Sequence, residues 1–326
     1  MIRVFLVLLA LLAVFFVLAL ALGDQRLPFS VVLGALLGAG ETPGHVQTIV
    51  TGLRLPRATL AILVGAALGV AGAICQAVLR NPLAEPGLLG INAGAALAAM
   101  MIIVQAGTVP ESLLPLATFA GAVTMIAVIF GFAWRGGTTS LRIILIGVGL
   151  SAMAGAGASF IATFGEIALV QRAMVWLAGS LQDSRWIKVQ TLLIWASPVF
   201  LMIWMAAREL DLIALGDTVA RGRGQQVDLQ RVLMMLACAV LAGASVAAAG
   251  PIAFVGLAAP HMARALAGRR HVALIPAAAL IGALIVLVAD LAARRAMPPL
   301  QLPVGVVTAL LGAPFFGYLL WKKRYD

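Results

Sequence analysis

The most informative property of this 326-residue sequence is its lack of charge: charged residues make up 10% of the chain, whereas hydrophobic residues make up 63%. Soluble globular proteins carry about 25% charged residues. The 12 acidic and 22 basic side chains are too few to cover a water-facing surface of this size. The composition excludes a soluble enzyme and a disordered chain, and it favours a protein whose surface lies largely in lipid.

Cysteine and histidine are also scarce. Cys75 and Cys238 lie within apolar runs, which is typical of small core residues and excludes a secreted disulfide scaffold. The three histidines, His45, His261 and His271, form no close pair at the spacing of metal ligands. The sequence therefore predicts no metal site and no bound cofactor.

Motifs for catalysis and for nucleotide binding are absent as well. The three lysines, at positions 188, 322 and 323, do not belong to a Gly-x-x-x-x-Gly-Lys-Ser/Thr loop, so we do not expect this chain to hydrolyse ATP. No Ser-His-Asp order, zinc-protease motif or close carboxylate pair lies in the apolar runs, and we predict no catalytic residue. The basic residues are scattered without interleaved aromatic residues, which excludes nucleic acid as a partner.

Long apolar runs dominate the rest of the sequence. A helix needs about 20 apolar residues to cross the roughly 30 Å hydrocarbon core of a bilayer. The first run resembles a signal peptide, but its length and the runs that follow favour a first membrane span. The sequence predicts an all-α polytopic membrane protein, a single transmembrane domain over residues 1–326 with about ten spans. The predicted spans are 4–22, 57–79, 87–106, 113–134, 141–164, 189–207, 229–249, 254–267, 272–293 and 304–321.

The basic residues predict the topology of these spans. With the N-terminus in the cytoplasm, 14 of the 22 basic residues fall on the cytoplasmic side, as the positive-inside rule requires. An even number of spans then returns the C-terminus to the cytoplasm. Ionisable residues within the spans are few. The clearest is Asp290, four residues before Arg294, and we interpret the two as a local ion pair.

Three segments between the spans are unusual. Residues 208–224 mix charge with regularly spaced leucine and valine, which predicts a short amphipathic helix interrupted at Gly216. This helix is either a solvated connector or a docking helix for a cytoplasmic partner. Residues 80–87 contain two prolines and predict a sharp turn. Residues 250–261 are apolar but punctuated by glycine and proline, which predicts a broken, short span.

Five motifs stand in order along the chain, from the second span to the last. They are residues 54–57, 81–90, 212–216, 250–256 followed by Pro260-His261, and 302–314. Together they make the sequence resemble the FecCD family, the permeases of the iron-chelate, haem and cobalamin branch of ABC importers, over essentially the whole chain. The resemblance implies a type II ABC importer permease fold and a second, identical or homologous permease subunit. It also implies cytoplasmic ATP-binding subunits and an extracytoplasmic substrate-binding protein as partners.

The resemblance also implies roles for individual residues. Arg223-Gly224 stands where the family commonly has Leu-Gly, which is the one departure in the docking segment. The residues implied to couple to the ATP-binding subunit are Leu212, Leu215, Gly216, Asp217, Ala220 and Arg221. The residues implied to form a cytoplasmic gate are Asn81, Leu83, Thr139 and Ser140. The residues implied to dock the binding protein on the outer side are Arg54, Arg57 and Arg294.

The function implied is ATP-driven import of a metal chelate through the bacterial inner membrane, by a multi-pass subunit surrounded by lipid. Residues 176–181 favour a ferric siderophore, with haem or cobalamin as alternatives within the family. A stand-alone secondary transporter is the alternative from another class. The scarcity of ionisable residues within the spans argues against proton coupling, and the missing phosphate loop requires an external source of energy.

Overall fold

The computed structural model describes residues 1–23, 25–38, 43–105, 113–134, 137–297 and 300–322, and its regular structure there is helical apart from one isolated bridge pair. The short 3-10 helix Pro86–Leu89 and the π-helical segments Thr48–Arg54 and Met101–Gln105 accompany the α-helices. The α-helices are α1 (Ile2–Ala21), α2 (Phe29–Leu37), α3 (Gly44–Gln47), α4 (Leu55–Val78), α5 (Ile91–Met100), α6 (Leu113–Ala133), α7 (Ser140–Phe164), α8 (Ile167–Leu177), α9 (Trp186–Met205), α10 (Ala207–Ala214), α11 (Asp217–Gly222), α12 (Val227–Ala249), α13 (Val255–Ala267), α14 (His271–Arg295) and α15 (Val304–Lys322).

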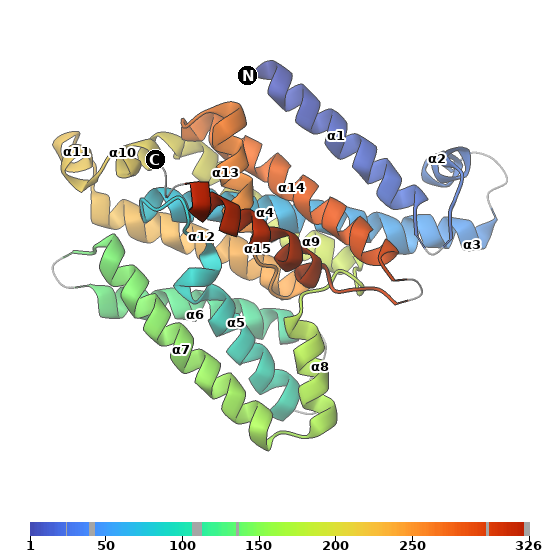
Figure 1. Cartoon of the computed structure of the whole chain (residues 1–326), viewed down its shortest axis with the longest axis horizontal. Helices are drawn as coiled ribbons and strands as arrows, with labels where there is room; N and C mark the ends of the chain where they lie inside the picture. Colours follow the sequence, from blue (N-terminus) through green and yellow to red (C-terminus); the bar gives the residue numbers. More distant parts are fainter. Residues whose placement is uncertain (24, 39–42, 106–112, 135–136, 298–299, 323–326) are drawn as a thin grey trace.

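Helices α4, α12 and α14 form the centre of the molecule (Figure 1). In the most apolar stretch of α12 78% of the residues are buried, against 17% in α1, α7 and α9. The central helices therefore pack against protein, whereas the outer helices present apolar side chains at the molecular surface. Such a surface is stable in lipid or against another membrane subunit.

Small residues allow the central helices to approach closely. Gly65 of α4 faces Gly282 of α14, and a Cβ atom on either residue would collide with the other backbone. A Cβ atom on Gly72 would likewise collide with the backbone of Gly256 in α13. Close backbone contact of this kind stabilises helix pairs in lipid, where apolar burial no longer drives helices together.

The predicted all-α, multi-span fold is confirmed. Seven of the ten predicted spans coincide with helices that are long and apolar enough to cross a membrane. The other three coincide with the shorter helical stretches Ile91–Gln105, Val255–Ala267 and the α15 helix. Residue 106, the predicted end of the third span, lies outside the described residues.

One predicted boundary needs correction, and two helices were not predicted. The second span does not begin at residue 57, because one helical stretch of 35 residues runs from Gly44 to Val78. The π-helical turns Thr48–Arg54 directly precede α4, and the helix continues through Pro56 even though proline lacks an N–H donor. Helices α2 and α8 were not predicted, because 9 and 11 residues are too few for a span.

The two irregular segments are confirmed. Helices α10 and α11 are separated at Gly216, whose φ of 110° lies outside the range that side-chain-bearing residues readily adopt. Residues 250–254 are not helical, and Phe254 has a φ of 67° before α13 begins. Helices α10 and α11 lie at the opposite end of the molecule from α2 and α3 (Figure 1).

Candidate functional site

The amphipathic segment α10–α11 is attached to the helix bundle by one face and exposes the other. Leu210 and Ile213 are fully buried, whereas Leu212 is only partly buried. Leu215 and Val219 are 66% and 47% exposed. An exposed apolar pair on a charged segment is suited to contact with another protein, because apolar groups gain free energy when they leave water.

Asp217 connects this segment to the bundle. It is the first residue of α11, directly after the break at Gly216. Its Oδ1 atom accepts a hydrogen bond of 2.8 Å from Nη2 of Arg231 and lies 3.5 Å from Nη2 of Arg80. Arg80 immediately precedes Asn81, so the predicted coupling segment contacts the start of the predicted gate.

The structure places Ser140, from one predicted gate segment, against the end of α4 just before the other segment. The Asn81 Oδ1 atom accepts a hydrogen bond of 3.0 Å from the backbone N–H of Leu83, which closes a side-chain turn. Ser140 donates from Oγ to the carbonyl of Val78 over 3.2 Å, so the start of α7 rests on the end of α4. Thr139 caps α7 by accepting from the backbone N–H of Arg142 over 3.4 Å.

Three further residues near this gate were not singled out from the sequence. Arg231, with no exposed surface, donates from Nη1 to the carbonyl and, over 3.1 Å, to the Oγ1 atom of Thr138. The Oδ1 atom of Asp228 accepts from the backbone N–H of Thr138 over 2.8 Å. Arg231 and Asp228 lie in the first turns of a long apolar helix. From the sequence, their charge predicts that each makes a polar contact but does not identify the partner.

A partly buried carboxyl group fixes the far end of the predicted gate turn. Glu85 accepts a hydrogen bond of 3.3 Å from the backbone N–H of Phe254, the residue with the left-handed backbone before α13. Burial raises the pKa of Glu85 above its ordinary value, and the hydrogen bond from Phe254 opposes this rise. The turn between α4 and α5 is therefore held both to α11 and to the broken segment 250–254.

The three arginines implied to dock the binding protein are buried in this conformation. The exposed fractions of Arg54, Arg57 and Arg294 are 8%, 9% and 6%. Arg57 donates to both carboxylate oxygens of Asp290 and, over 2.7 Å, to the amide oxygen of Gln301. Burial of a charged group is costly without partners, and here the partners lie within the chain.

The local ion pair predicted for Asp290 and Arg294 is confirmed, at 3.2 Å between Oδ2 and Nε. The Nη1 atom of Arg54 donates to the carbonyls of Leu20 and Ala21 over 2.7 and 3.1 Å. These carbonyls belong to the last turn of α1, where backbone acceptors lack partners within the helix. Arg54 therefore caps the C-terminus of α1, and its positive charge interacts favourably with the negative end of the helix dipole.

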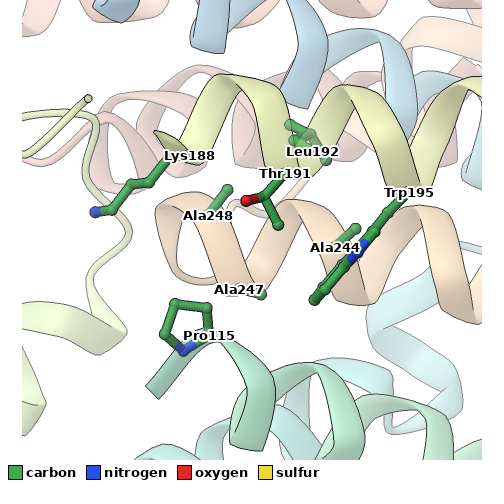
Figure 2. A pocket seen from close by; sticks show the side chains of 8 residues that line it. All are labelled: Pro115, Lys188, Thr191, Leu192, Trp195, Ala244, Ala247 and Ala248. Atoms are coloured by element: carbon green, nitrogen blue, oxygen red, sulfur yellow. The ribbon is translucent and has the colours of Figure 1, made fainter. Parts of the chain in front are cut away.

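A small recess lies between α6, α9 and α12. Its volume is about 20 Å³, and it is lined mainly by apolar side chains with Lys188 at one edge (Figure 2). A volume of this size holds about one water molecule. The recess is too small for a metal chelate, and we assign it no role in substrate binding.

A polytopic helical fold with an amphipathic segment at one end, next to a tightly held turn, defines the chain as a membrane permease. The chain belongs to the FecCD transport family, whose model matches residues 11–322. As a member of this family it is a multi-pass permease subunit of an ABC importer, and its role is transport rather than catalysis.

Relatives along nearly the whole chain support this membership. The iron(3+)-hydroxamate import system permease protein of Bacillus subtilis (strain 168) is 40% identical and covers 96% of this chain and 95% of its own length. The ferric enterobactin transport system permease protein of Escherichia coli (strain K12) is 38% identical, covering 92% and 90%. The hemin transport system permease protein of Yersinia pestis is 38% identical, covering 83% of each chain.

A solved structure has the same fold. It is the inward-facing conformation of an ABC transporter assigned to the metal-chelate type. It matches with a TM-score of 0.89 and 28% identity, over 99% of this chain and 100% of the solved one. The type II importer fold implied by the sequence motifs is therefore confirmed.

Proposed function

We propose that this chain is one permease subunit of an ATP-driven importer for an iron chelate, with ferric siderophores as the substrate class. The names of relatives support this class, since they include importers of iron(3+)-hydroxamate, ferric enterobactin and achromobactin. Haem is the second candidate, because the relative from Yersinia pestis is a hemin permease. Cobalamin is the third, and it rests on the family resemblance alone.

The exposed face of α10–α11 is the observation that supports ATP as the energy source, because an ATP-binding subunit could dock there. Leu215 and Val219 offer apolar contacts, and Arg221 adds a cation 58% exposed at its side chain. A cytoplasmic ATP-binding subunit with an apolar groove would bury this face as a helix in a groove. The proposed docking segment is residues 208–224. The other coupling residues shape this segment and hold it to the bundle; they are Leu212, Gly216, Asp217 and Ala220.

The same proposal includes a second permease subunit, identical or homologous, and a surrounding bilayer. Helix α7 supports it, because Leu141, Leu145, Val148 and Met153 are each more than half exposed. A pathway wide enough for a chelate would lie between two such subunits, with Asn81, Leu83, Thr139 and Ser140 at its cytoplasmic end. Residues 1–326 would form a single permease domain.

The proposed location is the bacterial inner membrane, with both termini in the cytoplasm. The positive-inside count supports this orientation. It puts α10 and α11 in the cytoplasm and α2 and α3 outside, which agrees with their positions at opposite ends of the molecule (Figure 1).

Docking of an extracytoplasmic binding protein by Arg54, Arg57 and Arg294 stays a prediction. In this conformation acceptors within the chain occupy all three guanidinium groups. Docking through them would require carboxylates of the binding protein to replace Asp290 and the carbonyls of α1. Opposite charges would then steer the two proteins together and set their orientation.

Reconstitution in liposomes tests the proposed function. The permease is assembled with an ATP-binding subunit and a binding protein from the same organism, and uptake of a ⁵⁵Fe-labelled ferric hydroxamate is measured with and without ATP. Uptake should require ATP and both partners, and excess hemin or cyanocobalamin should not compete. Uptake driven by an ion gradient with the permease alone would contradict the proposal, and competition by hemin would reassign the substrate class.

A further inference from the structure

Arg231 occupies a central position between the docking segment and both gate segments. It is the largest side chain in the described protein with almost no exposed surface, and it projects from the second turn of α12. Its Nη2 atom donates to Asp217 of α11, and its Nη1 atom donates to Thr138, directly before the gate residues Thr139 and Ser140. One planar guanidinium group therefore joins α11 to the start of α7.

The second gate segment reaches the same carboxylate. Asp217 Oδ1 is 3.5 Å from Nη2 of Arg80, and Arg80 precedes the Asn81 turn. Arg80 itself has a left-handed backbone, with a φ of 51°, so its position is set by the chain around it rather than by its own preference. Asp217 thus contacts one gate segment through Arg80 and the other through Arg231.

The two contacts of Asp217 differ in strength because they differ in exposure. In the pair with Arg80 the side chains are 39% and 24% exposed, so water and salt screen the attraction. The Arg231 side chain is fully buried and forms the shorter contact. A buried guanidinium with a rigid fork of donors cannot follow a moving partner without losing hydrogen bonds at its other end. Arg231 is therefore the stronger of the two connections.

We propose that Arg231 is a positioning residue that transmits movement of α11 to the Thr138–Ser140 side of the gate, with Arg80 as a weaker second connection to the Asn81 side. This inference rests on the proposed docking of an ATP-binding subunit on α10–α11. When α11 moves with its partner, Asp217 moves with it. The buried guanidinium group and the backbone of Thr138 must then shift together.

Two substitutions test this role, and of the two residues only Arg231 lies outside the proposed docking segment. Arg231→Met removes both contacts, and Asp217→Asn keeps the shape of the side chain while weakening the ionic contact. Arg269→Met is the matched control, since Arg269 is an exposed arginine between α13 and α14, outside the docking and gate segments. Each variant is purified in complex with its ATP-binding subunit, and assembly, ATP hydrolysis, ⁵⁵Fe uptake and disulfide cross-linking through Leu83→Cys are measured.

Arg231→Met should still copurify with the ATP-binding subunit and hydrolyse ATP, but uptake per ATP should fall at least tenfold. Cross-linking at position 83 should lose its dependence on nucleotide. Asp217→Asn should show a smaller loss of the same kind, and Arg269→Met should behave as wild type. Unchanged uptake per ATP in Arg231→Met would overturn the inference, as would unchanged uptake in Asp217→Asn if Arg231→Met fails to insert. Loss of copurification in Leu215→Glu tests docking separately, so the two ideas can fail independently.

Discussion

Arg57 and Asp290 face each other in bidentate geometry although 233 positions separate them in sequence. Nε and Nη2 of Arg57 lie 3.0 and 2.9 Å from Oδ1 of Asp290, and the carboxylate has no exposed surface. The same carboxylate also meets Arg294. One buried anion therefore serves two buried cations and fixes the start of α4 against the end of α14.

Replacing Asp290 with asparagine should destabilise the folded protein strongly. Removing one member of a buried ion pair typically costs about 3–5 kcal/mol, since the remaining charge is left buried without its partner. Thermal unfolding in detergent measures the change. The control is Asp183→Asn, whose carboxylate is 58% exposed and pairs with Arg185 and Lys188 at the surface. A surface pair contributes only about 0–1 kcal/mol, so equal losses in both variants would contradict the structural role of Asp290.

Arg54 distinguishes an anchoring role from a docking role. We expect Arg54→Gln to lower the unfolding temperature, because the last carbonyls of α1 lose a charged donor. If the arginines also dock the binding protein, this variant should bind that protein more weakly. Binding by the wild type should also weaken as the salt concentration rises. The exposed Arg26 provides the control substitution, Arg26→Gln. Lower stability with unchanged, salt-independent association would show that Arg54 is an anchor only.

Gly216 should not tolerate a side chain. Its φ and ψ of 110° and 153° lie in a region that is essentially restricted to glycine, where other residues cost about 1–3 kcal/mol. A Cβ atom there would also lie 3.3 Å from Nη1 of Arg80. Gly216→Val should insert in the membrane but show reduced transport in the assembled complex. Wild-type transport would mean that the break between α10 and α11 is dispensable.

Replacing glycine with alanine should have opposite effects on stability at the bundle centre and at its surface. Gly65→Ala should disrupt folding, because the added methyl group collides with the Gly282 carbonyl. Gly131 in α6 has no atom within 4 Å of an added Cβ atom. Gly131→Ala should stabilise the protein by about 0.4–1 kcal/mol, since alanine has fewer unfolded conformations to lose. The yield of monodisperse protein and its unfolding temperature measure both effects.

Glu85 should make stability depend on pH. Its pKa is raised in the folded protein, chiefly by burial. Its stabilising contribution is therefore complete below the ordinary carboxyl pKa and is lost as the pH rises through the folded value. Glu85→Gln cannot ionise, so its unfolding temperature should fall less than that of the wild type over this range. Parallel pH profiles of the two proteins would show that folding does not raise the pKa of Glu85.

The sequence predicted the parts of the fold that composition and local punctuation determine. Apolar length located the spans, and Gly216 located the break between α10 and α11. Residues 250–254 were predicted to be irregular because glycine and proline interrupt an apolar run there. The start of α4 was misplaced, because a π-helical segment before Pro56 is not visible in the apolar pattern.

Contacts between distant residues could not be predicted in the same way. Asp290 was assigned to Arg294 because the two lie four positions apart, yet its bidentate partner is Arg57 from another helix. Arg231 gave no signal beyond a charge near the start of a span. Its role depends on Thr138, 93 positions away, and only the packed bundle brings the two together.

Helix α4 links the two faces of the membrane in a single rigid body. Its 24 residues, Leu55 to Val78, extend about 36 Å at 1.5 Å per residue, and glycine contacts along it leave little space for bending. In the proposed orientation Arg54 and Arg57 lie at its extracytoplasmic end, and Arg80 lies two residues beyond its cytoplasmic end. If a protein bound outside displaced α4 along its axis, the helix would therefore transmit that displacement to the turn at its cytoplasmic end. No change in secondary structure would be needed.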